Sequence, residues 1–236
     1  MHIGKSYKLS EFLIWTKLNI LLHLVVGILA TCIYQIVEIK WIAIPWTVVA
    51  LLGTATAFIV GFKNTQTYNR TWEARQIWGA ILNSSRTWGT LCRDFPGSSV
   101  KTRELVYRHF AWLTALRYQM RESRVWETTH KSYNERYRAN YSVPESETPL
   151  ETELAKYMPE AELEYILATK NRAAQLLSLQ SKTLKELFNS KELDNYQFVE
   201  MQKMVKDFFD HQGKSERIKN FPYPRQFATI NAIFIK

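Results

Sequence analysis

The chain has 236 residues, and its 31 Lys and Arg against 22 Asp and Glu give a formal net charge of +9. An aromatic content of 14% excludes an intrinsically disordered chain, and eight Gly with seven Pro exclude a collagen-like repeat. Two cysteines, Cys32 and Cys92, are too few for a disulfide framework and have no metal-binding spacing. The mean hydropathy of −0.26 is that of a soluble protein, but it averages over two very different parts of the chain.

Two uncharged apolar segments follow an N-terminal amphipathic segment of residues 1–17. Residues 18–37 and residues 41–62 contain no Asp, Glu, Lys or Arg. Because about 20 apolar residues cross a bilayer, each segment predicts a transmembrane helix, and the three residues between them predict an antiparallel hairpin. A cleaved signal peptide is disfavoured because its apolar region is only about 7–15 residues long. A buried hairpin in a soluble protein is the other alternative, and two such runs in tandem disfavour it.

Basic residues flank the outer ends of both predicted spans. Positive charge close to a span marks its cytoplasmic side, so the pattern predicts a multi-pass membrane protein whose N-terminus and main domain are cytoplasmic and whose partner is the lipid bilayer. Tryptophans near the span ends agree with an interfacial position. The flanking basic residues are Lys5, Lys8, Lys17, Lys63, Arg70 and Arg75, and the tryptophans are Trp15, Trp41 and Trp46.

The second predicted span carries two stripes with a spacing of four residues. Small residues at this spacing let helix backbones approach closely in lipid. The neighbouring stripe could pack against another helix or face lipid, which the pattern alone favours, or its members could form apolar rings around an ion pathway that gate by dewetting. The small stripe is Gly53, Ala57 and Gly61, and the larger stripe is Thr54, Phe58 and Phe62.

The rest of the chain predicts helices, so the fold class is an all-α membrane protein. The second span is expected to continue as one helix to about residue 79. Residues 80–222 predict a cytoplasmic helical domain with a turn at 95–99, an acidic loop or short helices at 141–164, and two helices within 160–211 that separate near Asn189. Gly213 is expected to end the second of these helices. Residues 223–236 predict the start of a third membrane helix.

Catalytic patterns are missing from the sequence. The five histidines have no metal-ligand spacing, and no phosphate-binding loop or nucleophile motif is present. The carboxylate pairs Glu162/Glu164 and Asp207/Asp210 fit helix surfaces. Acidic residues are interspersed with the basic ones, which disfavours nucleic-acid binding. The sequence therefore predicts neither an enzyme nor a bound cofactor or metal.

Two segments carry a resemblance to a known family. Residues 61–62, 68–75 and 78–79 resemble the signature that ends the second helix of the bestrophin family. Residues 216–218 and 222–224 resemble the stretch that leads into the third membrane helix of the same family. The matching signature residues are Arg70, Trp72, Glu73, Arg75, Arg217, Pro222 and Pro224.

The resemblance implies a homopentameric channel in the bacterial inner membrane that conducts small monovalent ions, chiefly chloride, through one pore on the five-fold axis. The neck of the family's pore matches Thr54, Phe58 and Phe62, and Thr54 departs from the usual Ile or Val. The cytoplasmic aperture would lie near Tyr196. The chain ends where the third membrane helix of the family begins, so the rest of that helix, a fourth span and the calcium-binding segment of the eukaryotic members are expected to be missing. A membrane-anchored helical scaffold or sensor without conduction is the alternative.

Overall fold

The computed structural model describes residues 9–127, 134–135 and 142–235, and in these ranges it contains helices and no strand. The chain forms two compact units, residues 1–60 with 126–142 and residues 61–125 with 143–236. The boundary between Val60 and Gly61 lies inside helix α2 (Trp46–Asp94). Residues 1–8 of the predicted amphipathic segment, with Lys5 and Lys8, and the last residue of the predicted third span lie outside the described residues. The predicted all-α class is confirmed.

The connection between the first two helices is longer than predicted. Helix α1 spans Leu9–Gln35, a short 3-10 turn, η1, spans Lys40–Ile42, and α2 begins only at Trp46. Pro45 explains the late start, because the residue before a proline is disfavoured in the helical conformation. Its carbonyl oxygen accepts the first helical hydrogen bonds, from the N–H groups of Val48 at 3.0 Å and Val49 at 3.3 Å. The prediction of a three-residue turn was therefore wrong.

Two helical segments among the described residues are long and apolar enough to cross a membrane. They are Thr16–Gln35 in α1 and the stretch Lys40–Asp94 that contains α2. The most apolar window of each is 0% buried. Residues in the core of a soluble hairpin would be buried, so within this chain the two helices do not form such a core.

The sequence predicted that this helix ends near residue 79, but α2 continues to Asp94. Its buried residues Ile77, Ile81, Trp88 and Cys92 lie four, seven and four residues apart, which is the spacing of one helical face. Packing of this face outweighs the helix-weakening effect of Gly79 and Gly89, each about 1 kcal/mol relative to Ala. Burial also raises the pKa of the Cys92 thiol, which stays protonated.

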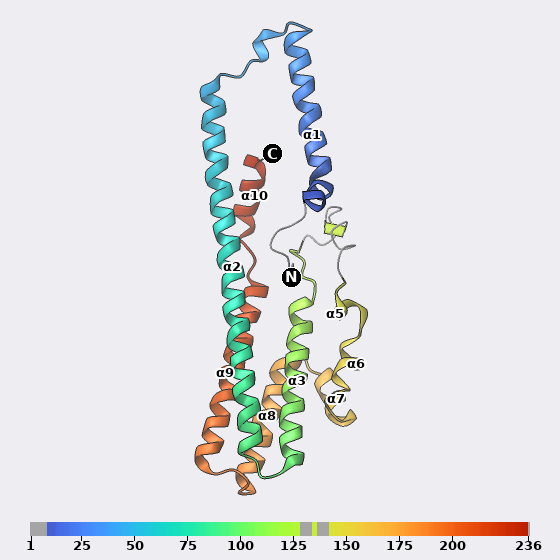
Figure 1. The fold of residues 1–236 in the computed structure, drawn as a ribbon, viewed down its shortest axis with the longest axis vertical. Helices are drawn as coiled ribbons and strands as arrows, with labels where there is room; N and C mark the ends of the chain where they lie inside the picture. Colours follow the sequence, from blue (N-terminus) through green and yellow to red (C-terminus); the bar gives the residue numbers. More distant parts are fainter. Residues whose placement is uncertain (1–8, 128–133, 136–141, 236) are drawn as a thin grey trace. The chain divides into compact units, whose positions relative to one another are not determined.

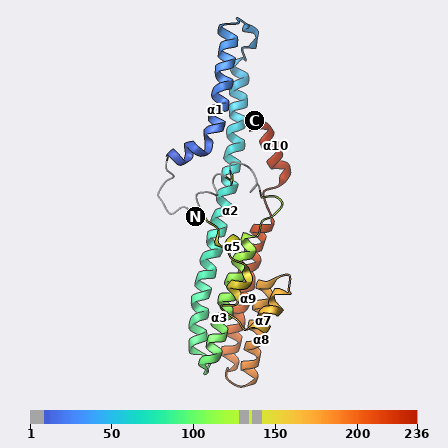
Figure 2. The same cartoon turned by 90° about the vertical axis from the view of Figure 1, so that its right-hand side faces the viewer.

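The second unit is a bundle of long helices. Helices α3 (Ser99–Arg121), α8 (Arg172–Asn189) and α9 (Asn195–Asn220) lie side by side with the later part of α2 (Figure 1 and Figure 2). The predicted turn at 95–99 and the predicted separation near Asn189 agree with these bounds. Between α3 and α8 the chain forms three short helices, α5 (Pro144–Glu147), α6 (Leu150–Leu154) and α7 (Glu160–Leu167), and α9 is followed by α10 (Arg225–Ile235).

Large aromatic side chains join three of these helices in the core. Trp88 of α2, Trp112 of α3 and Phe208 of α9 are each at most 1% exposed. The ring centroids of Trp112 and Phe208 lie 4.9 Å apart, and those of Trp88 and Phe208 lie 5.8 Å apart with nearly perpendicular planes. Apolar residues of α8, such as Leu176 and Leu184, complete the same cluster. This core fixes the helices that lead toward the signature residues.

Gly213 does not end α9, which continues to Asn220. The helix stops where Pro222 follows, because proline has no N–H to continue the hydrogen-bond ladder and disfavours the helical conformation of the residue before it. Gln212, next to the glycine, is 2% exposed, and its amide accepts a hydrogen bond from the Trp112 indole N–H at 3.0 Å. The buried Gln212 before Gly213, and the partly buried Ile218 after it, which packs against the core, thus hold the helix together.

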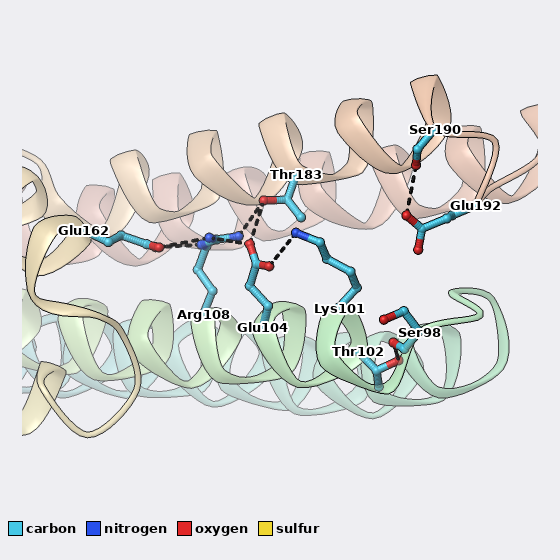
Figure 3. A network of polar contacts seen from close by, with 9 residues as sticks. All are labelled: Ser98, Lys101, Thr102, Glu104, Arg108, Glu162, Thr183, Ser190 and Glu192. Carbon is cyan, nitrogen blue, oxygen red and sulfur yellow. Dashed lines mark hydrogen bonds and ion pairs between the residues drawn. The ribbon is translucent and has the colours of Figure 1, made fainter.

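A polar network crosses the bundle at Arg108, which is 6% exposed (Figure 3). Its guanidinium donates to both carboxylate oxygens of Glu162, at 2.7 and 3.0 Å, to Glu104 at 3.0 Å and to the Thr183 hydroxyl at 2.8 Å. Burial alone would lower the pKa of Arg108, but the hydrogen bonds and charges of Glu162 and Glu104 raise it. The prediction that Glu162 lies on a solvated helix surface was therefore wrong, because its side chain is only 19% exposed and pairs with a buried charge.

Candidate functional site

The side chains of the larger stripe on α2, Thr54, Phe58 and Phe62, are exposed in the single chain. Phe58 is 66% exposed and Phe62 is 67% exposed, although both are large apolar residues. A spacing of four residues places successive members about 6 Å apart along the helix, on one side of it. The Thr54 hydroxyl donates to the Ala50 carbonyl oxygen at 2.9 Å, so its hydrogen is used within the helix. This side of α2 can contact an ion pathway, lipid or another chain.

The small stripe is also open in the single chain. A Cβ atom built at Gly53 or at Gly61 would meet no heavy atom within 4 Å, and Ala57 is exposed. The described residues thus leave room beside both glycines, and the role of the small stripe in close helix packing remains a prediction.

Arg70 is the signature residue with the most specific contacts. Its two terminal guanidinium nitrogens donate to the carbonyl oxygens of Phe221 at 2.9 Å and Ile218 at 2.8 Å. Ile218 lies in the last turn of α9 and Phe221 is the C-cap residue of this helix, where carbonyl groups have no partner within the helix. Arg70 on α2 therefore caps α9 from outside that helix.

A second signature pair lies beside the first. Arg217 of α9 donates to the carboxylate of Glu73, which lies three residues after Arg70 on α2. Pro222 follows the end of α9, and the carbonyl oxygen of Pro224 accepts the first hydrogen bond of α10, from Ala228 N–H at 3.0 Å. The structure thus brings the two halves of the sequence signature together.

The remaining predicted site residues are exposed. Trp72 is 49% exposed and Arg75 is exposed on α2. Tyr196, the predicted aperture residue, lies in the first turn of α9 at the opposite end of that helix from Arg217 and is 83% exposed. Among the described residues, no group of three or more His, Cys, Asp or Glu side chains could hold a metal ion.

His109 is a titratable group that the sequence did not single out. It is 5% exposed and lies against Phe208, with ring centroids 4.7 Å apart. The Ser85 hydroxyl donates to the Ile81 carbonyl oxygen at 2.7 Å, so its oxygen accepts from His109 Nε2–H at 3.0 Å. Burial lowers the pKa of His109 to about 4, and the ring is therefore neutral at pH 7.

This buried imidazole predicts a loss of stability in acid. Above pH 6.5 His109 is neutral in the folded and the unfolded chain, and below that pH only the unfolded chain takes up the proton. The free energy of unfolding should therefore fall by about 3 kcal/mol between pH 6.5 and pH 4 through this residue. Thermal unfolding in detergent across this range should show a shallower pH dependence for His109→Gln than for the unmodified chain. Equal slopes would contradict the assignment.

The chain is similar in sequence to a family of known proteins. The sequence profile of the family described as Bacterial/Fungal Bestrophin protein matches residues 12–235. A voltage-dependent anion channel-forming protein of Ralstonia nicotianae is 24% identical over 201 residues, which cover 82% of this chain and 58% of that protein. The voltage-dependent anion channel-forming protein YneE of Escherichia coli K12 is 24% identical over 197 residues, covering 84% and 56%. The chain thus spans less than two thirds of the length of these relatives.

Solved structures show the same fold. A crystal structure of a variant of a bacterial bestrophin homologue from Klebsiella pneumoniae superimposes with a TM-score of 0.77 at 22% identity, covering 93% of this chain and 73% of that one. A second structure, described only as that of a membrane protein, has a TM-score of 0.77 at 23% identity with the same coverage. Together with the two exposed apolar helices, the family match and this fold show that the chain is an all-α membrane protein that belongs to the bacterial and fungal bestrophin family.

Proposed function

We propose that this chain is a subunit of a homopentameric channel that conducts small monovalent ions, chiefly chloride. The observation that carries the proposal is the exposed stripe of Phe58 and Phe62 on a helix apolar enough to cross a membrane. Two large aromatic side chains that are mostly exposed in their own chain fit a surface that is completed by other copies. The description of two relatives as anion channel-forming proteins supports the choice of ion.

In this proposal the stripe forms the neck of the pore. Five copies of Phe58 and Phe62 surround the axis, and Thr54 forms the outermost ring. Such apolar constrictions gate ion flow by dewetting. The small residues Gly53, Ala57 and Gly61 let neighbouring helices pack closely around the neck.

The bundle of the second unit lines a cytoplasmic vestibule in the same proposal. Basic residues outnumber acidic ones in the chain by nine, and a positively charged vestibule raises the local concentration of anions. The N-terminus and the bundle lie in the cytoplasm of a bacterium, α1 and α2 cross its inner membrane, and Tyr196 at the far end of α9 lies at the cytoplasmic aperture.

Ion flux from liposomes tests the function directly. Liposomes that contain the full-length protein and are loaded with chloride should release it faster than protein-free liposomes of the same lipid, and a sodium gradient should decay more slowly than a chloride gradient. Sedimentation in detergent should give five copies. A monomer that carries neither ion would support the alternative, a membrane-anchored helical scaffold, and would refute the channel.

A further inference from the structure

Two contacts connect α2 with the end of α9, and they run in opposite directions. Arg70 of α2 donates to the carbonyl oxygens of Ile218, in the last turn of α9, and of Phe221, the C-cap residue of that helix, at 2.8 and 2.9 Å. Arg217 of α9 donates to Glu73 of α2. These five residues also line one cleft of about 270 Å³. We call Arg70, Glu73, Arg217 and the two carbonyl groups the α2–α9 latch.

In the first half of the latch, Arg70 donates hydrogen bonds to backbone carbonyl groups at the end of a helix. The last carbonyl groups of a helix lack intrahelical donors and carry the negative end of the helix dipole. Pro222, directly after Phe221, has no N–H to offer. The planar fork of a guanidinium can reach two carbonyl oxygens at once, whereas the ammonium of a lysine is a point charge. The position therefore calls for arginine rather than for positive charge alone.

The Arg217 half of the latch is more exposed. The side chain of Arg217 is 59% exposed and that of Glu73 is 41% exposed. Exposed ion pairs contribute little to folding, so the overall stability of the protein does not explain this pair. The position of the pair explains it, because Glu73 lies three residues after Arg70 on α2. The pair therefore holds the same two helices at the same level.

The latch lies close to the proposed neck along the same helix. Phe62 precedes Arg70 by eight residues, which is about 12 Å along α2. At its other end the latch holds the last turn of α9, and α10 begins five residues after Asn220. A movement of α2 that narrows the neck would have to break both contacts or carry the end of α9 with it.

We propose that the α2–α9 latch positions the neck helix and thereby sets the fraction of time for which the channel is open. This inference rests on the proposed pentameric channel. Five Phe62 side chains around one axis gain from burying apolar surface against one another, which favours a narrow, closed neck. The latch holds each α2 against its own bundle and opposes this collapse. Arg70, Glu73 and Arg217 are thus positioning residues for permeation.

Single-channel recording of the reconstituted protein tests the latch. Arg70→Gln should lower the open probability about tenfold, the effect of losing about 1.4 kcal/mol of charge-assisted hydrogen bonding, with the single-channel conductance unchanged. The open probability of Arg70→Lys should lie between that of Arg70→Gln and that of the unmodified protein. The matched control is Arg93→Gln, an exposed arginine of the same helix that pairs with the adjacent Asp94 at the surface, and it should leave the open probability unchanged.

A charge exchange separates positioning from folding. Glu73→Arg and Arg217→Glu should each lower the open probability, and the double variant should restore it, while the midpoint of thermal unfolding changes little in all three. If Arg70→Gln fails to assemble, the exchange series still decides the question. An unmodified protein without any current would refute the channel itself. Normal channel currents with unchanged or increased open probability in the latch variants would refute the latch alone.

Discussion

Phe58→Ala is expected to raise chloride flux through the reconstituted protein by roughly an order of magnitude. In the proposed neck the change removes five phenyl rings from one level of the pore, which widens the constriction and makes it easier to wet. A reduction of only about 1.4 kcal/mol in the barrier gives a tenfold rate. Chloride efflux from liposomes, normalised to the amount of assembled protein, measures the effect.

A matched phenylalanine and a reversed change sharpen this test. Phe110→Ala removes the same ring from α3, where Phe110 is 43% exposed and lies near Tyr157, and it should leave the flux unchanged. Thr54→Ile adds apolar surface to the outermost ring and should lower the flux. A Phe58→Ala protein with unaltered flux would show that the stripe faces lipid or another helix rather than the ions.

Arg108→Ala should destabilise the helical bundle by about 3–5 kcal/mol, because it removes the buried guanidinium that pairs with the partly buried carboxylates of Glu104 and Glu162. Glu162 loses both of its hydrogen bonds from Arg108, and Glu104 keeps its hydrogen bond from Lys101. Burial would raise the pKa of Glu104, but the hydrogen bonds from Lys101 and Arg108 lower it, so the loss of one donor also moves this pKa upward. Denaturant unfolding in detergent, followed by circular dichroism, measures the change.

Two further variants show whether the buried charge is the cause. Arg93→Ala removes an exposed arginine from α2 and should leave the midpoint of denaturant unfolding almost unchanged. Arg108→Met combined with Glu162→Met replaces the buried pair by apolar side chains and should recover much of the stability. If the double variant is as unstable as Arg108→Ala, lost packing rather than the unpaired carboxylates accounts for the effect.

The sequence was sufficient to predict those properties that depend on residues close together in the chain. The lack of charge in 18–37 and in 41–62 predicted two apolar helices, and the structure has both exposed. Helix boundaries were predicted less well. Pro45 delayed the start of α2, and the packing of Ile77, Trp88 and Cys92 extended it beyond Gly79 to Asp94. Glycine weakens a helix by about 1 kcal/mol, which is less than a buried aromatic side chain contributes.

The signature showed which residues belong together without showing what they do. Arg70 and Ile218 are 148 residues apart in sequence, and their hydrogen bond exists only because α2 and α9 pack against each other. Arg108 and Glu162 meet across 54 residues in the same way, and no local pattern distinguishes Glu162 from a surface carboxylate.

The sequence by itself determined the class of this protein: two apolar helices, a helical polar domain and a stripe of Thr54, Phe58 and Phe62. Hydropathy is an average over adjacent residues, and helical spacing is a pattern of nearby positions. Both can therefore be read without knowledge of the fold. Only the tertiary structure decided that Arg70 caps α9, that Arg217 returns to Glu73, and that Arg108 and His109 are buried. These contacts join segments that are far apart in sequence. Their interaction energies depend on desolvation and geometry that arise only when the helices have packed.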